Sequence, residues 1–488
     1  MDNFCTVNFY EGKLQKGSSK GSFANYNPAT GELICTVQSS SVDDVNKAVN
    51  SAQIGFKVWS KTSPTERGRI LRRAAELLRE RNDEIARIEV EDTGKPLSEA
   101  IDVDVTSGAD ALEFFGGVVA ATQGGYHNLG GSFAYTKKEP LGVCAGIGAW
   151  NYPIQIACWK SAPALAAGNS MIFKPSEETP RTAVILAQVF KEAGLPDGVF
   201  NIIQGEGDIG AMLTSNPYIR KVSLTGEVDT GKRVMADCAS TLKHVTLELG
   251  GKSPLIICED ADIDEAVKGA MMANFYTQGE ICSNGTRVYV AESIKEEFYN
   301  KLIENSKRLV IGDPMDMDTQ VGALIHKEHY NKVMRYIELG KQECKLIYGG
   351  NRYIPSDNSK LKGGYFVEPT VFESSNEESV IVKEEIFGPV MTVIPFNNEE
   401  EVIEKANNTI YGLAAGVFTN NLKKAHWMVD QLEAGMCWIN NYNVNPVEIP
   451  FGPYKESGFG KENGLAALDA YTQIKTVYVE MNKIDSPY

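Results

Sequence analysis

The sequence predicts an α/β protein: a Rossmann-like nucleotide-binding domain, a second α/β domain and a small β element. The first observation is the length of 488 residues, which exceeds the roughly 100–200 residues of one domain. The second is a rhythm of short apolar runs and helical stretches that begins near residue 141, and the third is a similar rhythm beyond Gly251. Such alternation is typical of parallel sheets with crossover helices. We expect domains at 1–250 and 251–440, with 441–488 returning to the site between them.

Local signals define the elements of the first domain. Ser63 can cap a helix that starts at Pro64, because Glu66 lies three residues on and apolar residues then recur at helical spacing. The strand candidates that follow are Val143–Trp150, Ser170–Phe173, Phe200–Ile203, Lys221–Leu224 and Val245–Leu249; the helix candidates are Thr182–Ala193, Gly207–Thr214 and Thr230–Ala239. This order predicts a doubly wound sheet, which binds its ligand at the carboxyl ends of its strands.

The second rhythm has its own elements and ends in an isolated strand. Its strand candidates are Val288–Ala291, Val390–Pro395, Leu413–Thr419 and Met436–Asn440; its helix candidates are Asp264–Gln278, Ile294–Leu309, Lys327–Gly340 and Leu422–Leu432. The last candidate strand, Lys475–Glu480, has nothing after it to pack against. A terminal apolar strand without a partner of its own suggests pairing with another subunit.

Composition narrows the possible partners. Sixty-four acidic and 48 basic residues give a net charge of −16 without a basic cluster, so we expect neither nucleic acid nor anionic membranes as partners. A cationic small-molecule substrate fits this sign. The nine cysteines are scattered without a CxxC pair, which argues against a disulfide framework or thiolate zinc site and favours a reducing compartment. With no signal peptide or membrane-length apolar run, we expect a soluble cytoplasmic protein.

Four strand ends carry small or polar residues suited to ligand binding. They are Ala149–Pro153, Phe173–Glu177, Leu224–Gly231 and Leu247–Lys252. In a doubly wound sheet these segments should converge on one crevice. Gly205–Gly210 also spells GxGxxG, but it falls in the third strand–helix unit and carries two acidic residues that would face phosphate. We interpret it as a tight turn, with cofactor contact as the alternative.

Cys282 differs from the other cysteines in its surroundings. The segment Gln278–Gly285 places it at a glycine-flanked turn between a predicted helix and a predicted strand, which leaves its sulfur accessible. Cys144 and Cys258 lie inside strand runs and Cys158 lies on a helix, as expected of a cysteine that packs as a small hydrophobe. The turn therefore predicts an accessible thiol at Cys282 rather than a packed one.

These five segments, in order, resemble the aldehyde dehydrogenase superfamily over nearly the whole chain. Glu384–Val390 and Pro450–Gly458 are similar to two further signatures of that family. The resemblance implies that Cys282 attacks the aldehyde as a thiolate and that the Asn151 amide and the Cys282 N–H hold the oxyanion. It makes Glu248 the general base for the thiol, or for the water that hydrolyses the thioester. Lys160 and Glu462 resemble a charge relay of the betaine aldehyde branch, with a surface ion pair as the alternative.

The resemblance also implies NAD as cofactor, with NADP possible. The Glu177 carboxylate, expected at the adenosine ribose, would repel the 2′-phosphate of NADP. Gly226 and Thr230 lie at a helix start suited to the pyrophosphate, but Glu227 stands there where relatives usually carry a small residue. The positions that match cofactor contacts are Ala149, Trp150, Asn151, Lys174, Ser176, Glu177, Gly226, Thr230, Gly250, Glu385 and Phe387.

Within the superfamily, Trp150–Lys160 and Asn440–Val444 are most similar to the betaine aldehyde and 4-trimethylaminobutyraldehyde dehydrogenases. Tyr152 and Trp159 lie seven apart on one predicted helix and Phe451 resembles a third wall, so we expect an aromatic pocket for a quaternary ammonium aldehyde. Two further acidic residues either attract a cation or are solvated surface charges. They are Asp104, which matches a channel carboxylate of aminoaldehyde-oxidising relatives, and Glu280, which replaces a usual glutamine.

The betaine branch further implies potassium, bound largely through carbonyls. The matching positions are Asn25, Tyr26, Asp92, Glu178, Leu242, Lys455 and Gly458. The family also favours a homodimer or homotetramer, with a hairpin near residues 120–140 and the tail strand as the joining elements. Three alternatives remain open: an aminoaldehyde or neutral aldehyde dehydrogenase, a cysteine hydrolase, and a non-catalytic protein of the same fold.

Overall fold

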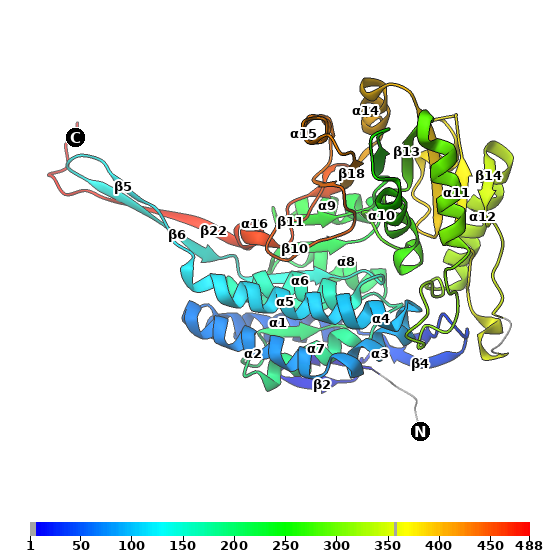
Figure 1. Ribbon diagram of the computed structural model, residues 1–488. Helices are drawn as coiled ribbons and strands as arrows, with labels where there is room; N and C mark the ends of the chain where they lie inside the picture. Colours follow the sequence, from blue (N-terminus) through cyan, green and yellow to red (C-terminus); the bar gives the residue numbers. More distant parts are fainter. Residues whose placement is uncertain (1–5, 356–358) are drawn as a thin grey trace.

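The computed structural model describes residues 6–355 and 359–488. Its body consists of an eight-stranded and a seven-stranded sheet, each accompanied by helices (Figure 1). The predicted α/β class, with parallel sheets and crossover helices, is therefore confirmed.

The eight-stranded sheet has a parallel centre and antiparallel edges. Its order is β2 (Lys13–Gln15), β1 (Asn8–Tyr10), β9 (Phe200–Ile202), β8 (Ser170–Lys174), β7 (Val143–Ile147), β10 (Ile219–Thr225), β11 (His244–Glu248) and β21 (Gly458–Phe459). The five strands predicted after residue 141 form its parallel centre. The edge strand β21 comes from the end of the chain and pairs antiparallel with β11, so the returning segment completes this sheet.

Helices with one apolar stripe accompany this sheet. They are α1 (Val42–Trp59), α2 (Pro64–Glu80), α3 (Asn82–Thr93), α4 (Leu97–Glu99), the π-helical turn η1 (Ala100–Val105), α5 (Thr106–Val118), α6 (Pro153–Ala166), α7 (Thr182–Glu192), α8 (Gly207–Ser215) and α9 (Val228–Ala239). The predicted start of α2 is confirmed, since Ser63 Oγ accepts a hydrogen bond from the Glu66 N–H and Pro64 is the first helical residue. Helix α6 is buried along its whole length, and it carries side chains from the core towards the site.

The seven-stranded sheet is parallel except at β14. Its order is β14 (Lys345–Tyr348), β15 (Thr370–Glu373), β16 (Val390–Phe396), β13 (Arg287–Ala291), β12 (Pro254–Ile257), β18 (Ala414–Phe418) and β19 (Met436–Ile439). Its helices are α10 (Ile263–Phe275), α11 (Lys295–Ser306), α12 (Lys327–Glu343), α13 (Val380–Lys383), α14 (Glu399–Asn407) and α15 (Leu422–Gln431). Helix α16 (Gly464–Ala470) follows the returning segment, and the short pairs are β3 (Ser22–Tyr26) with β4 (Leu33–Gln38) and β17 (Tyr411–Gly412) with β20 (Tyr454–Lys455).

Two element predictions need correction. The helix expected over Asp264–Gln278 ends at Phe275, because Thr277 and Gln278 adopt left-handed backbone in the short turn η3 (Tyr276–Gly279). The bounds of β12 were not predicted, although Cys258, which follows its last residue, was placed in a strand run. The strand lies inside the second sheet, between β13 and β18.

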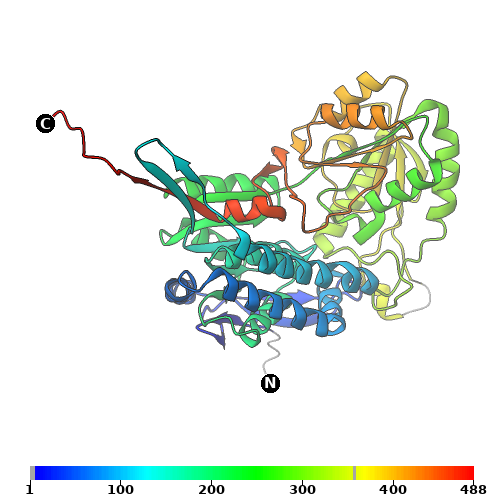
Figure 2. The same ribbon diagram turned by 60° about the vertical axis from the view of Figure 1, so that its left-hand side comes forward.

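A three-stranded antiparallel sheet projects from the body in both views (Figures 1 and 2). It contains β22 (Thr472–Val479), β6 (Phe133–Pro140) and β5 (Tyr126–Asn128). The expectation that the tail strand lacks a partner of its own is wrong, since β22 pairs with β6 of the same chain over its full length.

Two further features bear on the composition. No helix among the described residues is both long and apolar enough to cross a membrane. Cys35 takes part in a disulfide, which the scattered spacing of the cysteines did not predict, whereas Cys282 has a free thiol. Cys5 lies outside the described residues.

Candidate active site

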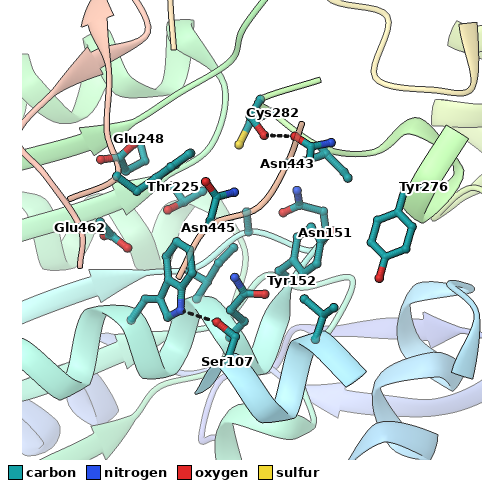
Figure 3. Close-up of a pocket in the computed structure, with 18 of the residues that line it drawn as sticks. Ser107, Asn151, Tyr152, Thr225, Glu248, Tyr276, Cys282, Asn443, Asn445 and Glu462 are labelled. Atoms are coloured by element: carbon teal, nitrogen blue, oxygen red, sulfur yellow. Dashed lines mark hydrogen bonds between the residues drawn. The ribbon is translucent and has the colours of Figure 1, made fainter. Parts of the chain in front are cut away.

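One cavity of about 610 Å³ lies where the two sheets and the returning segment meet. Three of the four predicted strand-end segments contribute to its wall, through Ala149–Tyr152 after β7, Thr225–Glu227 after β10, and Glu248 with Gly250 after β11. The fourth, Phe173–Glu177, does not line it. Side chains from distant parts of the chain therefore face one space (Figure 3).

Cys282 faces this cavity from the loop between η3 and β13 and is half-buried. A Cβ atom on Gly251 would lie 2.4 Å from the Cys282 carbonyl oxygen, so the glycine lets the loop approach the end of β11. Burial, together with the charges of Glu385 and Glu248, raises the pKa of the Cys282 thiol to about 12. The thiol is therefore protonated at neutral pH and needs a base to become a nucleophile.

Glu248 is the carboxyl group suited to that task. It is buried, and neither of its oxygens has a hydrogen-bond partner among the described residues. Burial raises its pKa well above the ordinary value, with a further contribution from Glu462. A Cβ on Gly452 would lie 2.7 Å from Glu248 Oε1, so this glycine of the returning segment leaves room for the carboxyl. An unpartnered buried carboxyl at a cavity wall is poised to exchange protons.

Asn151 directs its amide towards the same cavity from the turn before α6 (Figure 3). Its Nδ2 donates one hydrogen bond to the Glu280 carbonyl oxygen at 2.9 Å. An amide nitrogen carries two hydrogens, so the second remains available to a ligand oxygen. The bond to Glu280 fixes the amide plane and ties Asn151 to the loop that carries Cys282.

Lys160 and Glu462 form a buried ion pair next to Glu248. Lys160 Nζ donates to Glu462 Oε1 and, at 3.0 Å, to Ser223 Oγ. Lys160 is wholly buried, whereas Glu462 reaches the cavity wall. The alternative of a surface ion pair is therefore wrong.

A further part of the cavity lining is built around Glu385. Glu385 Oε1 accepts a hydrogen bond from the Gly251 N–H at 2.9 Å. A Cβ on Gly250 would lie 2.2 Å from Glu385 Oε2, so a larger residue there would displace this carboxyl. Trp150 and Phe387 meet edge-to-face beside it, with ring centroids 5.2 Å apart. Among the predicted cofactor positions, Ala149, Trp150, Asn151, Gly226, Gly250, Glu385 and Phe387 line the cavity.

The remaining predicted cofactor positions lie outside this lining. They are Lys174, Ser176, Glu177 and Thr230. Lys174 is buried, and its Nζ donates to the Pro175 carbonyl at 2.8 Å and contacts Glu177 Oε2 at 3.2 Å. Thr230 lies in the first turn of α9, which begins without a side-chain cap and so has free N–H groups. The GxGxxG segment enters α8 and also lies outside the lining.

The three predicted aromatic residues, Tyr152, Trp159 and Phe451, all line the cavity. Trp159 and Phe451 meet edge-to-face at 6.0 Å, and Trp159 Nε1 donates to Ser107 Oγ at 3.1 Å. Tyr152 differs, because Lys95 Nζ lies 3.7 Å from its ring centroid. One ring face thus already carries a cation from the protein, which weakens it as a wall for a second cation.

The expectations for Asp104 and Glu280 need correction. Asp104 is wholly buried in an ion pair with Lys95 and does not line the cavity. Glu280 is neither a surface charge nor part of the lining: its carboxyl accepts hydrogen bonds from Gln278 Nε2 at 2.9 Å and the Ile325 N–H at 3.0 Å. Burial raises the pKa of Glu280 to about 8. Both side chains therefore interact with neighbouring residues inside the protein and not with the cavity.

Sequence reasoning missed several residues of the cavity lining, among them Asp102, Asp110, Glu448 and Tyr276. Signals in the sequence could have found three of these four. Asp102 and Asp110 lie eight apart, a spacing of slightly more than two helical turns. Tyr276 lies six residues before Cys282, in the segment already identified. Together they add three carboxylates and one aromatic ring to the wall.

The residues predicted to bind potassium fall into two groups. In the first, Asn25 Nδ2 donates to the Glu178 carbonyl at 2.8 Å, and Arg181 pairs with Asp92 Oδ1 at 2.6 Å. Asp92 Oδ2 is buried without a partner among the described residues, and Tyr26 is exposed beside Asn25. In the second group Leu242 lies exposed after α9, Lys455 lies in β20 and Gly458 lies in β21.

The chain is similar in sequence to known aldehyde dehydrogenases. A family model described as "Aldehyde dehydrogenase family" matches residues 15–477. Two curated relatives are both called betaine aldehyde dehydrogenase. The one from Vibrio vulnificus is 54% identical over 99% of each chain, and the one from Brucella anthropi is 55% identical over 94% of each.

Solved structures agree over the same length. A putative aldehyde dehydrogenase from Burkholderia cenocepacia superposes with a TM-score of 0.97 at 35% identity, covering 99% of both chains. The NAD⁺ complex of an aldehyde dehydrogenase from Bacillus cereus gives a TM-score of 0.94 at 39% identity, covering 99% of this chain and 97% of that one.

Proposed function

Because the chain belongs to the aldehyde dehydrogenase family, we propose that it oxidises betaine aldehyde, or a similar trimethylammonium aldehyde, to the carboxylate with NAD(P) as the oxidant. The carrying observation is that Cys282, Glu248 and Asn151 line one cavity whose other wall is aromatic and acidic. Relatives named for this substrate, 54–55% identical over 94–99% of the chain, support the choice.

The part of the cavity lining around Glu385 fits a dinucleotide. Glu385 offers carboxylate oxygens to ribose hydroxyls, and the uncapped start of α9 offers N–H groups to phosphate. When bound, NAD supplies the hydride acceptor that converts the thiohemiacetal on Cys282 into a thioester. Glu177 beside Lys174 favours NAD over NADP, because the carboxylate repels a 2′-phosphate.

Glu227 opposes the dinucleotide at the helix start. It is the N-cap residue of α9, its side chain makes no cap hydrogen bond, and it lines the cavity. We expect Glu227→Ser to lower the Kd for NADH about tenfold at low salt, because a negative charge close to the pyrophosphate is removed. The gain should shrink as salt rises.

Fluorescence titration of NADH measures this Kd. Asp237→Asn is the matched control, because it removes a carboxylate from the last turn of the same helix. An unchanged Kd for Glu227→Ser at low salt would show that the Glu227 carboxylate does not act on the pyrophosphate.

Acylation begins with a proton transfer from the Cys282 thiol to Glu248. The thiolate attacks the aldehyde carbon, and the oxyanion accepts hydrogen bonds from the free Asn151 N–H and the Cys282 backbone N–H. Loss of hydride from the former aldehyde carbon leaves the thioester.

Deacylation reuses Glu248 as the base for water. The hydroxide adds to the thioester carbonyl, the C–S bond breaks, and the carboxylate leaves. The proton on Glu248 can pass on because Glu462 and its partner Lys160 lie beside it. Net consumption is one aldehyde, one water and one oxidised dinucleotide.

The charge of the wall selects the substrate. Trp159, Phe451 and Tyr276 present aromatic rings, while Asp102, Asp110 and Glu448 add negative charge. A desolvated cation over an aromatic face gains about 1–2 kcal/mol per contact. We therefore expect a quaternary ammonium aldehyde to bind better than a neutral one of the same shape.

The neutral isostere 3,3-dimethylbutanal tests this choice, since it replaces only the cationic nitrogen of betaine aldehyde by carbon. We expect kcat/KM to favour betaine aldehyde by about tenfold or more, as one to two cation–π contacts predict. Steady-state kinetics with NAD measures the ratio. A tenfold preference for the neutral compound would mean that the wall does not select a cation.

Two finer proposals accompany this function. Potassium binds near Asn25, Asp92 and Glu178, where a carbonyl and an unpartnered buried carboxylate oxygen are available. The protein forms a homodimer or homotetramer through the projecting sheet, whose residues Tyr126, Ile474 and Tyr478 are exposed. Such exposed apolar side chains on a projecting sheet favour a subunit contact. The cellular location proposed with this function is the cytoplasm.

A further inference from the structure

The turn before Cys282 is strained. Thr277, Gln278 and Gly279 have φ values of 49°, 43° and 79°. Left-handed backbone suits glycine but is a genuine outlier for a β-branched residue such as Thr277. Strain of this kind persists only where the surroundings hold it. The question is which group holds Thr277.

Glu99 is the acceptor for the backbone N–H of Thr277 among the described residues. This N–H donates to the two carboxylate oxygens at 3.2 and 3.1 Å, and Thr277 Oγ1 donates to Glu99 Oε2 at 2.8 Å. Glu99 is buried at the end of α4, beside the π-helical turn η1. Tyr152 OH lies 2.8 Å from Thr277 Oγ1 and completes the hydrogen bonding of this hydroxyl.

The other end of the turn leads directly to the catalytic groups. A Cβ on Gly279 would lie 2.2 Å from the backbone of Gly388, so the turn has no room to move on that side. The next residue, Glu280, offers the carbonyl that anchors the Asn151 amide at 2.9 Å, and Cys282 follows two residues later. A shift of Thr277 therefore moves both the nucleophile and the oxyanion donor.

We propose that Glu99 is a positioning residue, whose carboxylate holds the left-handed turn at Thr277 and thereby sets the places of Cys282 and Asn151. Glu99 does not line the cavity, so we infer that it acts through the turn. The inference deepens the proposed function, on which it rests for the role of Cys282.

The reactivity of Cys282 in the free enzyme tests the proposal without any aldehyde. The probe is iodoacetamide, with alkylation of the Cys282 peptide followed by mass spectrometry. Three variants are compared: Glu99→Leu, which removes both acceptors at similar size; Glu99→Gln, which keeps one acceptor; and Glu113→Gln, a control on the exposed face of α5. Thermal unfolding is recorded for each.

We expect Glu99→Leu to lower kcat by about 10²-fold, because a displacement of about 1 Å can cost that much. The alkylation rate of Cys282 should change at least severalfold, with KM for NAD close to that of the wild type. Glu99→Gln should restore most of the loss, and Glu113→Gln should match the wild type in both readouts.

A second arm separates positioning from a general loss of stability. Thr277→Gly removes the conformational need for the clamp, since glycine adopts positive φ freely. The double variant Glu99→Leu/Thr277→Gly should therefore be no less active than Glu99→Leu alone. The proposal would be overturned if the two substitutions lowered kcat independently, so that their separate fold losses multiplied in the double variant. It would also be overturned if Glu99→Leu kept the wild-type kcat and the wild-type alkylation rate of Cys282.

Failure of this inference differs from failure of the proposed function. If the wild type prefers another aldehyde, kcat is measured with that aldehyde and the alkylation result still decides about Glu99. If Cys282 proves dispensable for turnover while its alkylation depends on Glu99, the proposed function fails and the positioning role stands.

Discussion

Cys282→Ala is expected to lower kcat by about 10⁴-fold or more, because removal of a covalent nucleophile leaves only binding and oxyanion stabilisation. Cys282 lines the cavity, and in the proposed mechanism the whole reaction passes through its thioester. Dinucleotide binding should be retained, since Glu385, Gly226 and the start of α9 are unchanged. The absorbance of NADH measures turnover, and fluorescence titration measures binding.

Cys344→Ala is the matched control for this variant. Cys344 is half-buried like Cys282 but lies next to Ser379, outside the cavity. It should keep wild-type turnover. Full activity in Cys282→Ala would contradict the assignment of Cys282 as the nucleophile. Loss of both turnover and dinucleotide binding would instead indicate misfolding.

Glu248→Gln is expected to lower kcat by about 10²–10⁴-fold, the range that general acid–base catalysis contributes. The pKa of Glu248 is raised by burial, so the fraction of active carboxylate grows as pH rises through that pKa. The wild-type kcat/KM should therefore increase with pH over this range. The kcat/KM of the variant should not show this rise with pH, because glutamine does not titrate.

Hydroxylamine adds a second readout to this prediction. It attacks a thioester without help from a base, so it should restore part of the turnover if the variant stalls at deacylation. Glu377→Gln is the control, since Glu377 is a half-buried carboxyl hydrogen-bonded by Tyr289 OH and lies outside the cavity. A Glu248→Gln variant with more than a tenth of wild-type kcat and an unchanged pH profile would contradict the assignment.

The elements that surround the site were largely predictable, because they carry strong local signals. The strands β7, β8, β10 and β11 end in small or polar residues, and this placed Asn151 and Glu248 at one edge of a sheet. The glycine-flanked turn predicted that the Cys282 thiol is accessible, whereas its role as nucleophile came from the family resemblance. In each case the side chain lies at a strand end or a tight turn, and the small or polar residues next to it mark that position in the sequence.

Other features depend on contacts that no local pattern encodes. Asp104 was expected in the channel, yet it pairs with Lys95, whereas Asp102, two residues earlier, faces the cavity. The π-helical turn η1 changes which side chains share a face, and composition does not reveal such a turn. The left-handed Thr277 was likewise predicted as helix, because its cause, Glu99, lies far away in the sequence.

The returning segment has a consequence for the order in which the protein matures. Tyr442 OH donates to the Ser283 carbonyl at 3.0 Å, Glu462 reaches the cavity beside Glu248, and β21 closes the edge of the first sheet. A chain that leaves the ribosome from its N-terminus exposes Cys282 long before these residues exist. The Cys282 thiol is therefore made well before Glu462 and β21. We expect the cavity around it to be complete only once the returning segment has docked.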